Sequence, residues 1–382
     1  MRTAYILPVI SMVFIFTSCA NEPLESDLNK TVITIDENDY KNVLNTSEII
    51  DTSTVGLIAL ESKNGIIGTV DKLVVTDSAF IILDKTTQKV WIFNISGEYI
   101  NAIEAHGRGP NEYSRIHTIT YKEPNLIGIL DDSQKRLLWF SLQGKFIEKH
   151  EIHYYACDVY AESSALHLMY RYIPENAPSH ENYYYHKKYL DSDSSEHALP
   201  YYPFGLFFTV DDPFFIVNDS ELLIRNPFDN GLYTYQDGVL AMKYALNFSK
   251  PKVPYDSDGY KGSPESLSRE IQSGDYQGNI SQVAFTSANL SMRYTEYQKE
   301  GGAEVVHIVY DIHNKGLKVF SGVTVEDDFE IYYQHPIASY KDQFFSVLHP
   351  YSLQAKTIER IGNIGDVQMA NPVIMSFKYS EN

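Results

Sequence analysis

Two consecutive stretches of this chain share one pattern, and that repeat limits the fold more than any other feature of the sequence. The first runs from Asp84 through Val-Trp-Ile-Phe to Gly97, and the second from Asp131 through Leu-Leu-Trp-Phe to Gly144. Asp and Gly are 13 positions apart in both copies, and the copies start 47 positions apart. A repeat of about 40–50 residues with strand-type patterning is typical of a β-propeller blade. The sequence therefore predicts an all-β propeller.

Short apolar runs bounded by Gly, Asn, Asp or Ser continue along the chain and indicate further blades. Six blades fit the spacing, and seven is the alternative, because residues 159–200 depart from the repeat. Later blades are expected at residues 214–238, 284–320 and 337–361. We expect the early strand at residues 32–35 to pair with the last blade, so that the ring has no open edge.

Two local predictions accompany this architecture. Residues 357–361 complete the last predicted blade and are expected to form its third strand. The stretch 250–279 is rich in Pro, Gly, Ser and Asp and predicts a loop with one short helix, capped by Ser263 and ended by Gly274.

The N-terminus predicts export and lipidation. Arg2 precedes an apolar run of 13 residues, from position 4 to position 16, which is long enough for a signal peptide and too short to span a bilayer. Thr17 and Ser18 then precede Cys19, as in a bacterial lipobox, although Phe16 replaces the usual Leu. We predict a signal peptide at residues 1–18, a lipid-modified Cys19, an acidic tether at 19–30 and a propeller domain at 31–382. An ordinary secretory signal is the alternative.

Charge and cysteine content exclude several classes of partner and site. The formal net charge of −19 argues against nucleic acid and anionic lipid surfaces as partners. Cys157 is the only cysteine besides Cys19, so a lipidated chain has no intramolecular disulfide. Asp158 beside it has the wrong charge to activate a thiolate, and Cys157 is expected to be a small buried residue.

A short motif, His106-Gly-Arg-Gly-Pro-Asn-Glu-Tyr113, lies between the two repeats. With its flanking Asp–Gly pattern it resembles the six-bladed β-propeller lipoproteins common in Bacteroidota, a branch of the NHL and TolB-like propellers. Asn111 stands where members carry Gly, a mild change because Asn also tolerates left-handed backbone. The resemblance implies a fold and an outer-membrane, lipid-anchored location, and it implies no reaction.

The motif has a functional and a structural interpretation. In the functional one, His106, Arg108 and Tyr113 are ligand contacts, with His106 and Arg108 facing the central channel. In the structural one, the motif connects two blades. Its turn geometry would then depend on Gly107, Gly109 and Pro110, and Glu112 would accept backbone N–H bonds or pair with Arg108.

The sequence offers little for metal binding or catalysis. His150 and His153 would lie on opposite faces of a strand, and no Cys/His cluster suits zinc. The sequence also lacks a Gly-x-Ser-x-Gly elbow. We therefore predict no metal site, no catalytic residue and no cofactor. Calcium is the alternative, held by carboxylate pairs at 131–132, 211–212 and 327–328, although none has the spacing of a calcium loop.

These observations predict a membrane-anchored, non-catalytic binding module of the bacterial cell envelope. Its ligand would be a glycan, a peptide or a partner protein. The 30 tyrosines include several adjacent pairs, which in a strand place one ring on each face, and outward rings suit stacking against such ligands. The alternative is a calcium-dependent, lactonase-type hydrolase, which would need several acidic or Asn side chains converging in the channel with perturbed pKa values.

Overall fold

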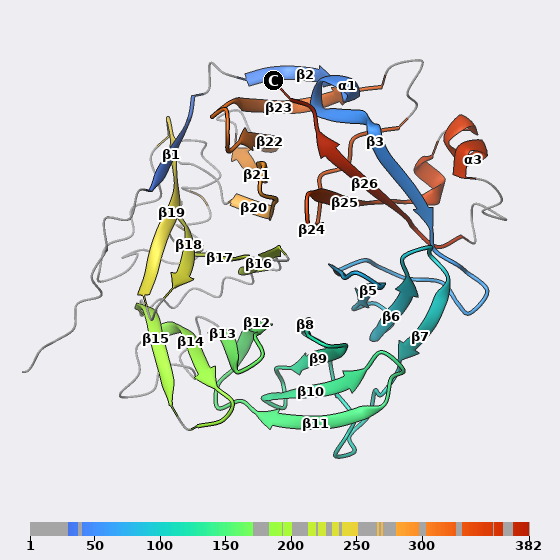
Figure 1. Cartoon of the computed structure of the whole chain (residues 1–382), viewed down its shortest axis with the longest axis vertical. Coiled ribbons are helices and arrows are strands. Elements are labelled where there is room, and N and C mark those ends of the chain that lie inside the picture. Colours follow the sequence, from blue (N-terminus) through green and yellow to red (C-terminus); the bar gives the residue numbers. More distant parts are fainter. Residues whose placement is uncertain are drawn as a thin grey trace, which may run out of the picture.

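The computed structural model forms a ring of six sheets around a central axis (Figure 1). It describes residues 30–36, 40–170, 183–192, 194–200, 213–218, 221–226, 231–236, 239–250, 266, 269, 280–297, 303–325, 331–353, 355–361 and 370–381. The predicted signal peptide, Cys19, residues 20–29 of the predicted tether and nearly all of the loop predicted at 250–279 lie outside these residues. The prediction of a six-bladed, all-β propeller is confirmed, and the seven-bladed alternative is wrong.

Each blade is a sheet whose first strand lies at the ring centre and whose later strands step outward. Blades 1 and 2 contain the two sequence repeats: β4 (Lys72–Val75), β5 (Ala79–Asp84), β6 (Lys89–Asn94) and β7 (Tyr99–Ile103), then β8 (Thr118–Lys122), β9 (Leu126–Asp131), β10 (Arg136–Ser141) and β11 (Phe146–Glu151). Blade 3 occupies the region where the repeat is weak: β12 (Ala156–Ala161), β13 (Ala165–Tyr170), β14 (Tyr183–Tyr189) and β15 (Ser195–Pro200).

The last three blades also contain strands from the start of the chain. Blade 4 comprises β16 (Phe215–Asn218), β17 (Glu221–Arg225), β18 (Gly231–Gln236), β19 (Val239–Phe248) and β1 (Thr31–Ile35). Blade 5 comprises β20 (Ile280–Phe285), β21 (Asn289–Tyr297), β22 (Ala303–Asp311), β23 (Leu317–Thr324) and β2 (Tyr40–Asn45). Blade 6 comprises β24 (Ala338–Tyr340), β25 (Gln343–Leu348), β26 (Val373–Tyr379) and β3 (Ile50–Ala59).

The repeated Asp fixes the same two contacts in blades 1 and 2. The Asp84 carboxylate accepts backbone N–H groups from Gly68, in the connector that enters the blade, and from Thr87, in the turn after β5, at 2.7 and 3.0 Å. Asp131 accepts the equivalent N–H groups of Ser114 and Gln134 at 2.7 and 3.2 Å. One buried carboxylate therefore joins the connector to the second hairpin, which explains why the sequence repeats it.

The repeated Gly ends the third strand of each of these blades. Gly97 and Gly144 have φ values of +86° and +74°, in the left-handed region that only Gly enters without strain. Each donates its N–H three residues back, Gly97 to Asn94 and Gly144 to Ser141, and so closes the turn to the outermost strand.

The ring closes differently from the prediction. The strand expected at residues 32–35 is present as β1, but it pairs in parallel with β19 of blade 4 and not with the last blade. β2 likewise pairs in parallel with β23 of blade 5, and β3 pairs antiparallel with β26 as the outermost strand of blade 6. The correction has a physical reason: all three early segments are strand-like, and only β3, after the short helix α1 (Thr46–Ile49), reaches the last blade.

A second correction concerns residues 357–361. They belong to helix α3 (Ala355–Ile361), which follows the 3₁₀ turn η3 (Pro350–Ser352), and not to a strand. Ile358 and Ile361 are three positions apart, which places them on one face of a helix but on opposite faces of a strand. β26 supplies the third strand of blade 6 and β3 its outermost strand, so the sheet is complete without residues 357–361.

Apolar side chains between neighbouring blades form the core. Blades 1 and 2, for example, share a buried cluster that includes Ile81, Ile92, Ile129 and Leu138. Within the described residues, no helix is long and apolar enough to cross a membrane.

Candidate functional site

A pocket of about 530 Å³ occupies the central channel. All six innermost strands contribute to its wall, through β4, β8, β12, β16, β20 and β24. Strands β16 and β24 belong to blades 4 and 6 and contact each other inside the ring, and blade 5 between them contributes only Val283 and Ala284. The pocket is therefore formed by the ring as a whole, because no single blade encloses it.

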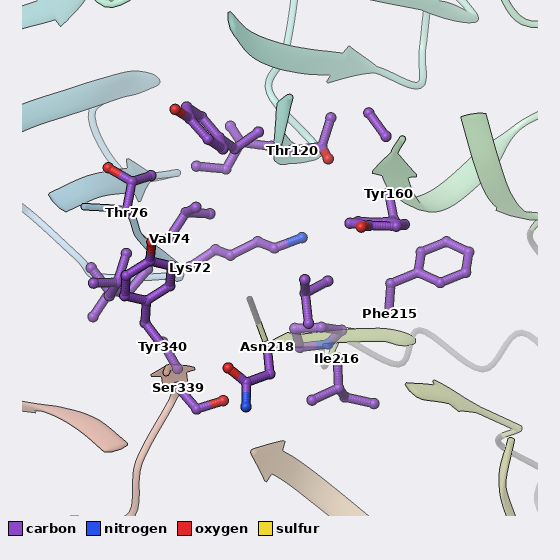
Figure 2. Close-up of a pocket in the computed structure, with 18 of the residues that line it drawn as sticks. Lys72, Val74, Thr76, Thr120, Tyr160, Phe215, Ile216, Asn218, Ser339 and Tyr340 are labelled. Atoms are coloured by element: carbon purple, nitrogen blue, oxygen red, sulfur yellow. The ribbon is translucent and has the colours of Figure 1, made fainter. Parts of the chain in front are cut away.

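The wall of the pocket is mainly apolar and aromatic. Figure 2 shows Val74, Ile216, Tyr160 and Phe215 around the same space. Tyr160 and Phe215 also pack against His167 of β13, with ring centroids 5.4 and 6.3 Å from the imidazole. This packing fixes the two aromatic side chains, so that their positions are set before any ligand binds.

Lys72 is the one cation among the described residues that line the pocket. It is the first residue of β4, and its side chain extends into the cavity (Figure 2). Its ammonium lies 3.2 Å from Thr118 Oγ1 in blade 2 and 3.2 Å from Asp158 Oδ1 in blade 3. Lys72 therefore links the innermost strands of three consecutive blades.

Asp158 is buried and receives hydrogen bonds from the backbone as well as from Lys72. Its Oδ2 accepts the N–H groups of Phe214 and Phe215 at 2.8 and 3.0 Å, and its Oδ1 accepts that of Val159 at 2.9 Å. Three backbone donors thus bind this carboxylate in addition to the ammonium.

Glu162 lies at the other end of the pocket, directly after β12. Its two carboxylate oxygens lie 2.9 Å from His167 Nε2 and 3.3 Å from Lys187 Nζ. The contact with His167 is the main cause that lowers the Glu162 pKa to about 2. Behind it, His167 is fully buried and its Nδ1 lies 2.7 Å from the Tyr185 hydroxyl. A carboxylate held ionised in this way is a poor proton acceptor and a fixed negative charge.

Polar groups without charge complete the wall. Asn218 comes from β16 and Ser339 from β24, the two contacting strands on either side of blade 5. Figure 2 shows both side chains at the pocket. Ser339 is only 7 % exposed, and its hydroxyl has no hydrogen-bond partner within the described residues. An unpartnered buried hydroxyl is costly, so a ligand acceptor would be stabilising there.

The sequence-predicted ligand residues lie in the connector between β7 and β8, and none of them lines this pocket. His106 and Arg108 are exposed. Tyr113 is fully buried, and its hydroxyl donates to the carbonyls of Gln88 and Ile103 at 2.8 and 3.1 Å. Burial raises the pKa of the Tyr113 hydroxyl. Tyr113 therefore anchors the connector to blade 1, and ligand binding by His106 and Arg108 stays a prediction.

The rest of the motif has the geometry of a turn. The Glu112 carboxylate accepts the Gly109 N–H at 2.8 Å and also occupies the space that a Cβ at Gly107 would need. The Glu112 carbonyl in turn accepts a hydrogen bond from Arg136 of blade 2. Of the two contacts predicted for Glu112, the structure thus contains the backbone one. Pro110 is exposed at the turn.

No group of three or more His, Cys, Asp or Glu side chains in the described part of the chain is arranged to hold a metal ion. Asp131 is committed to the hairpin contacts above, and Asp132 lies 3.9 Å from His117 Nδ1. The carboxylate pairs at 211–212 and 327–328 lie outside the described residues. His150 belongs to β11, and His153 follows that strand.

The pocket residues were not identified from the sequence, although a signal for them exists. Most of them lie on the first strand after an inter-blade connector, and the repeat spacing of 47 positions places residues 72–76 opposite residues 119–123. A Lys that opens such an otherwise apolar strand is the signal for Lys72. Of the adjacent tyrosines, Tyr184 and Tyr185 are on β14 and are both buried, so this pair presents no outward ring. Tyr332 is exposed and Tyr333 is buried, but both precede β24 and lie outside the strands.

Comparisons with other proteins extend the description. The family model described as a domain of unknown function, DUF4934, matches residues 30–378. No curated protein sequence matches this chain significantly.

Two solved structures from Bacteroides share the fold. A Bacteroides fragilis protein, provisionally designated as exported, has 14% identity and a TM-score of 0.70, over 92% of this chain and all of that one (100%). A member of the DUF4221 family from Bacteroides vulgatus has 12% identity and a TM-score of 0.50, over 86% of this chain and 98% of that one. At these identities the likeness concerns the fold alone.

Proposed function

Because the chain belongs to the DUF4934 family, a domain of unknown function, we propose its role from its own pocket: it is a non-catalytic binding protein of the cell envelope that takes a small ligand into the central channel. The ligand would have an apolar or aromatic body. A small glycan or a peptide side chain with such a body falls within this class.

The observation that carries the proposal is the pocket itself. Its volume of about 530 Å³ is within the range of small-molecule sites, roughly 300–1,000 Å³. Its wall also has the usual composition of such sites, an apolar and aromatic surface with a few polar groups at fixed positions. A protein partner docking on the rim would not require an apolar cavity of this size.

Binding is favoured over hydrolysis by the state of the acidic groups. Asp158 is occupied by three backbone N–H groups and Lys72, and Glu162 is held ionised by His167 and Lys187. A lactonase-type reaction would need several acidic or Asn groups converging on one point, and the described residues of the pocket wall contain no such arrangement. The calcium-dependent alternative therefore gains no support from the wall.

The location is proposed on separate grounds. The apolar run before Cys19 favours export and lipidation, which would place the protein on the outer membrane as a lipid-anchored chain. The designation of the Bacteroides fragilis protein as exported supports the export step.

The neutral fluorophore 1-anilinonaphthalene tests the proposal, with residues 19–382 produced without the signal peptide and therefore without lipid. We expect saturable, single-site fluorescence enhancement with the wild type. Val74→Trp fills the cavity from β4 and should weaken binding at least about tenfold. Val43→Trp is the matched control, because Val43 is 54% exposed on β2 and does not line the pocket. Equal binding by Val74→Trp and the wild type would contradict the proposal.

A further inference from the structure

The charges of the pocket are separated along its axis. Lys72 opens β4, whereas Glu162 and Glu123 follow the last residues of β12 and β8. The pocket therefore has a cationic group at one end of its innermost strands and anionic groups at the other. A molecule that fills it meets opposite charges at its two ends.

Lys72 has donor capacity that the protein does not use fully. A lysine ammonium has three N–H donors. Two of them have partners within the described residues, Thr118 Oγ1 and Asp158 Oδ1, both at 3.2 Å, which is long for a charge-assisted bond. The ammonium is largely buried, with 16% of the side chain exposed, and it extends into the cavity (Figure 2).

Asp158 does not depend on Lys72 alone. The N–H groups of Val159, Phe214 and Phe215 remain bonded to its carboxylate when the ammonium shifts toward a ligand. The cost of sharing Lys72 is therefore limited, since the buried carboxylate keeps three donors. An ammonium held by one saturated carboxylate and one hydroxyl is suited to bind a second anion.

The surrounding wall defines the rest of the molecule. Val74, Ile216 and Phe215 offer no polar group, so only an apolar body can lie against them without losing hydration. At the far end Glu162 is paired with His167 and Lys187, and no described lining residue there offers a cation to a second acidic group. The site is thus matched to one anionic group and one apolar body.

We infer that the ligand is an amphiphilic monoanion whose acidic group binds Lys72 and whose apolar body lies between Val74, Ile216 and the Tyr160–Phe215 wall. This inference rests on the proposed function, since it names the class of molecule that the same pocket takes. It also assigns Lys72 as the residue that selects for negative charge.

Two fluorophores with the same ring system test the inference. 1-Anilinonaphthalene-8-sulfonate carries one negative charge, and 1-anilinonaphthalene carries none. We expect the wild type to bind the sulfonate at least about tenfold more tightly than the neutral molecule, and Lys72→Met to abolish that difference while binding of the neutral molecule changes less than about threefold. Lys72→Arg keeps the charge and should retain most of the preference.

Lys63→Met is the matched control, because Lys63 is 70% exposed and does not line the pocket. It should leave both affinities unchanged. The inference is overturned if the wild type binds both fluorophores equally, or if Lys72→Met weakens both to the same degree, which would give Lys72 a structural role only. A wild type that binds neither fluorophore would instead overturn the proposed function, and the inference with it.

Discussion

Asp158 accepts the backbone N–H of Phe214 at 2.8 Å, and this bond joins the innermost strand of blade 3 to the start of β16 in blade 4. The same carboxylate binds Phe215 N–H and the Lys72 ammonium, so one side chain connects blades 1, 3 and 4 at the channel. The Asp158 carboxylate, which joins the blades, is therefore in direct contact with the Lys72 ammonium, to which we assign ligand selection.

Replacing Asp158 should destabilise the whole ring. Asp158→Ala removes the side-chain acceptor of three backbone N–H groups and of a largely buried ammonium, and removing one partner of a buried ion pair costs about 3–5 kcal/mol. We expect a clear drop in the urea midpoint. Asp77→Ala is the control, because Asp77 pairs with Lys341 at the surface, and its midpoint should stay close to the wild-type value. Equal midpoints for the two variants would contradict the assigned role of Asp158.

Two equivalent glycines should differ in their tolerance of a side chain. Gly97→Ala and Gly144→Ala both force a left-handed backbone on Ala, which costs about 1–2 kcal/mol. At Gly97 the new Cβ also meets the backbone carbonyl of Ala59 in β3, the strand that closes the ring, whereas at Gly144 it meets the end of the Asn101 side chain. Gly97→Ala should therefore lower the unfolding free energy more than Gly144→Ala in urea titrations, and the reverse order would be inconsistent with this geometry.

The fold could be predicted from the repeat because the repeated residues determine the geometry of turns and connectors. Asp84, Asp131, Gly97 and Gly144 each fix a turn or a connector, so their spacing indicates a blade even where the strands diverge. Ring closure was less predictable. Three successive strand-like segments precede blade 1, and which of them reaches β26 depends on contacts with residues about 300 positions away.

The site was harder to predict than the fold. The composition of the motif at 106–113 suggests ligand contacts, yet its Gly and Glu residues form a turn and Tyr113 is a buried anchor. The pocket residues come one or a few at a time from each innermost strand, and they resemble ordinary strand residues. Lys72 can be recognised as a site residue only from the folded ring, in which its ammonium contacts Asp158, a residue 86 positions further along the chain.

A histidine pair between blades 5 and 6, His335 buried and His307 half-buried, should make the protein less stable in mild acid. Burial, with a further effect of Arg293, lowers the pKa of His307 from 6.5 to about 4. Its Nδ1 lies 3.2 Å from that of His335, whose pKa burial also lowers. Since the folded protein binds fewer protons than the unfolded chain, this stability is present above pH 6.5 and is lost as the pH falls toward 4.

For His307 alone, the expected loss at pH 5 is about 2 kcal/mol. His307→Leu should flatten the dependence of unfolding free energy on pH between 7 and 5, whereas His106→Leu, at an exposed position, should leave it unchanged. Urea titrations at several pH values measure both. An unchanged slope in His307→Leu would show that other groups cause the acid sensitivity.

Lipidation at Cys19 predicts a simple change in location. Cys19→Ser removes the thiol that would carry the diacyl group, so the protein should move from the outer-membrane fraction to a soluble one. Labelling with a radioactive fatty acid should mark the wild type and not the variant. Cys157→Ser is the control, because Cys157 is a partly buried thiol of β12 whose Sγ contacts the Met169 carbonyl. Membrane association that survives Cys19→Ser would argue against the lipid anchor.

Calcium should have little effect on stability if the pocket binds organic ligands without a metal. A ligand that binds only the folded state raises the unfolding free energy by about 2.7 kcal/mol at a concentration of 100 times its Kd, which would raise the melting temperature by several degrees. Two acidic groups at the pocket are already paired, Asp158 with backbone N–H groups and Lys72, and Glu162 with His167 and Lys187. We therefore expect the same melting temperature in EDTA and in millimolar calcium, measured on residues 19–382, with magnesium as the control for ionic strength. A rise that is specific to calcium and reversed by EDTA would instead favour the lactonase-type hydrolase, since the carboxylates would then be metal ligands, and it would make lactones the first substrates to assay.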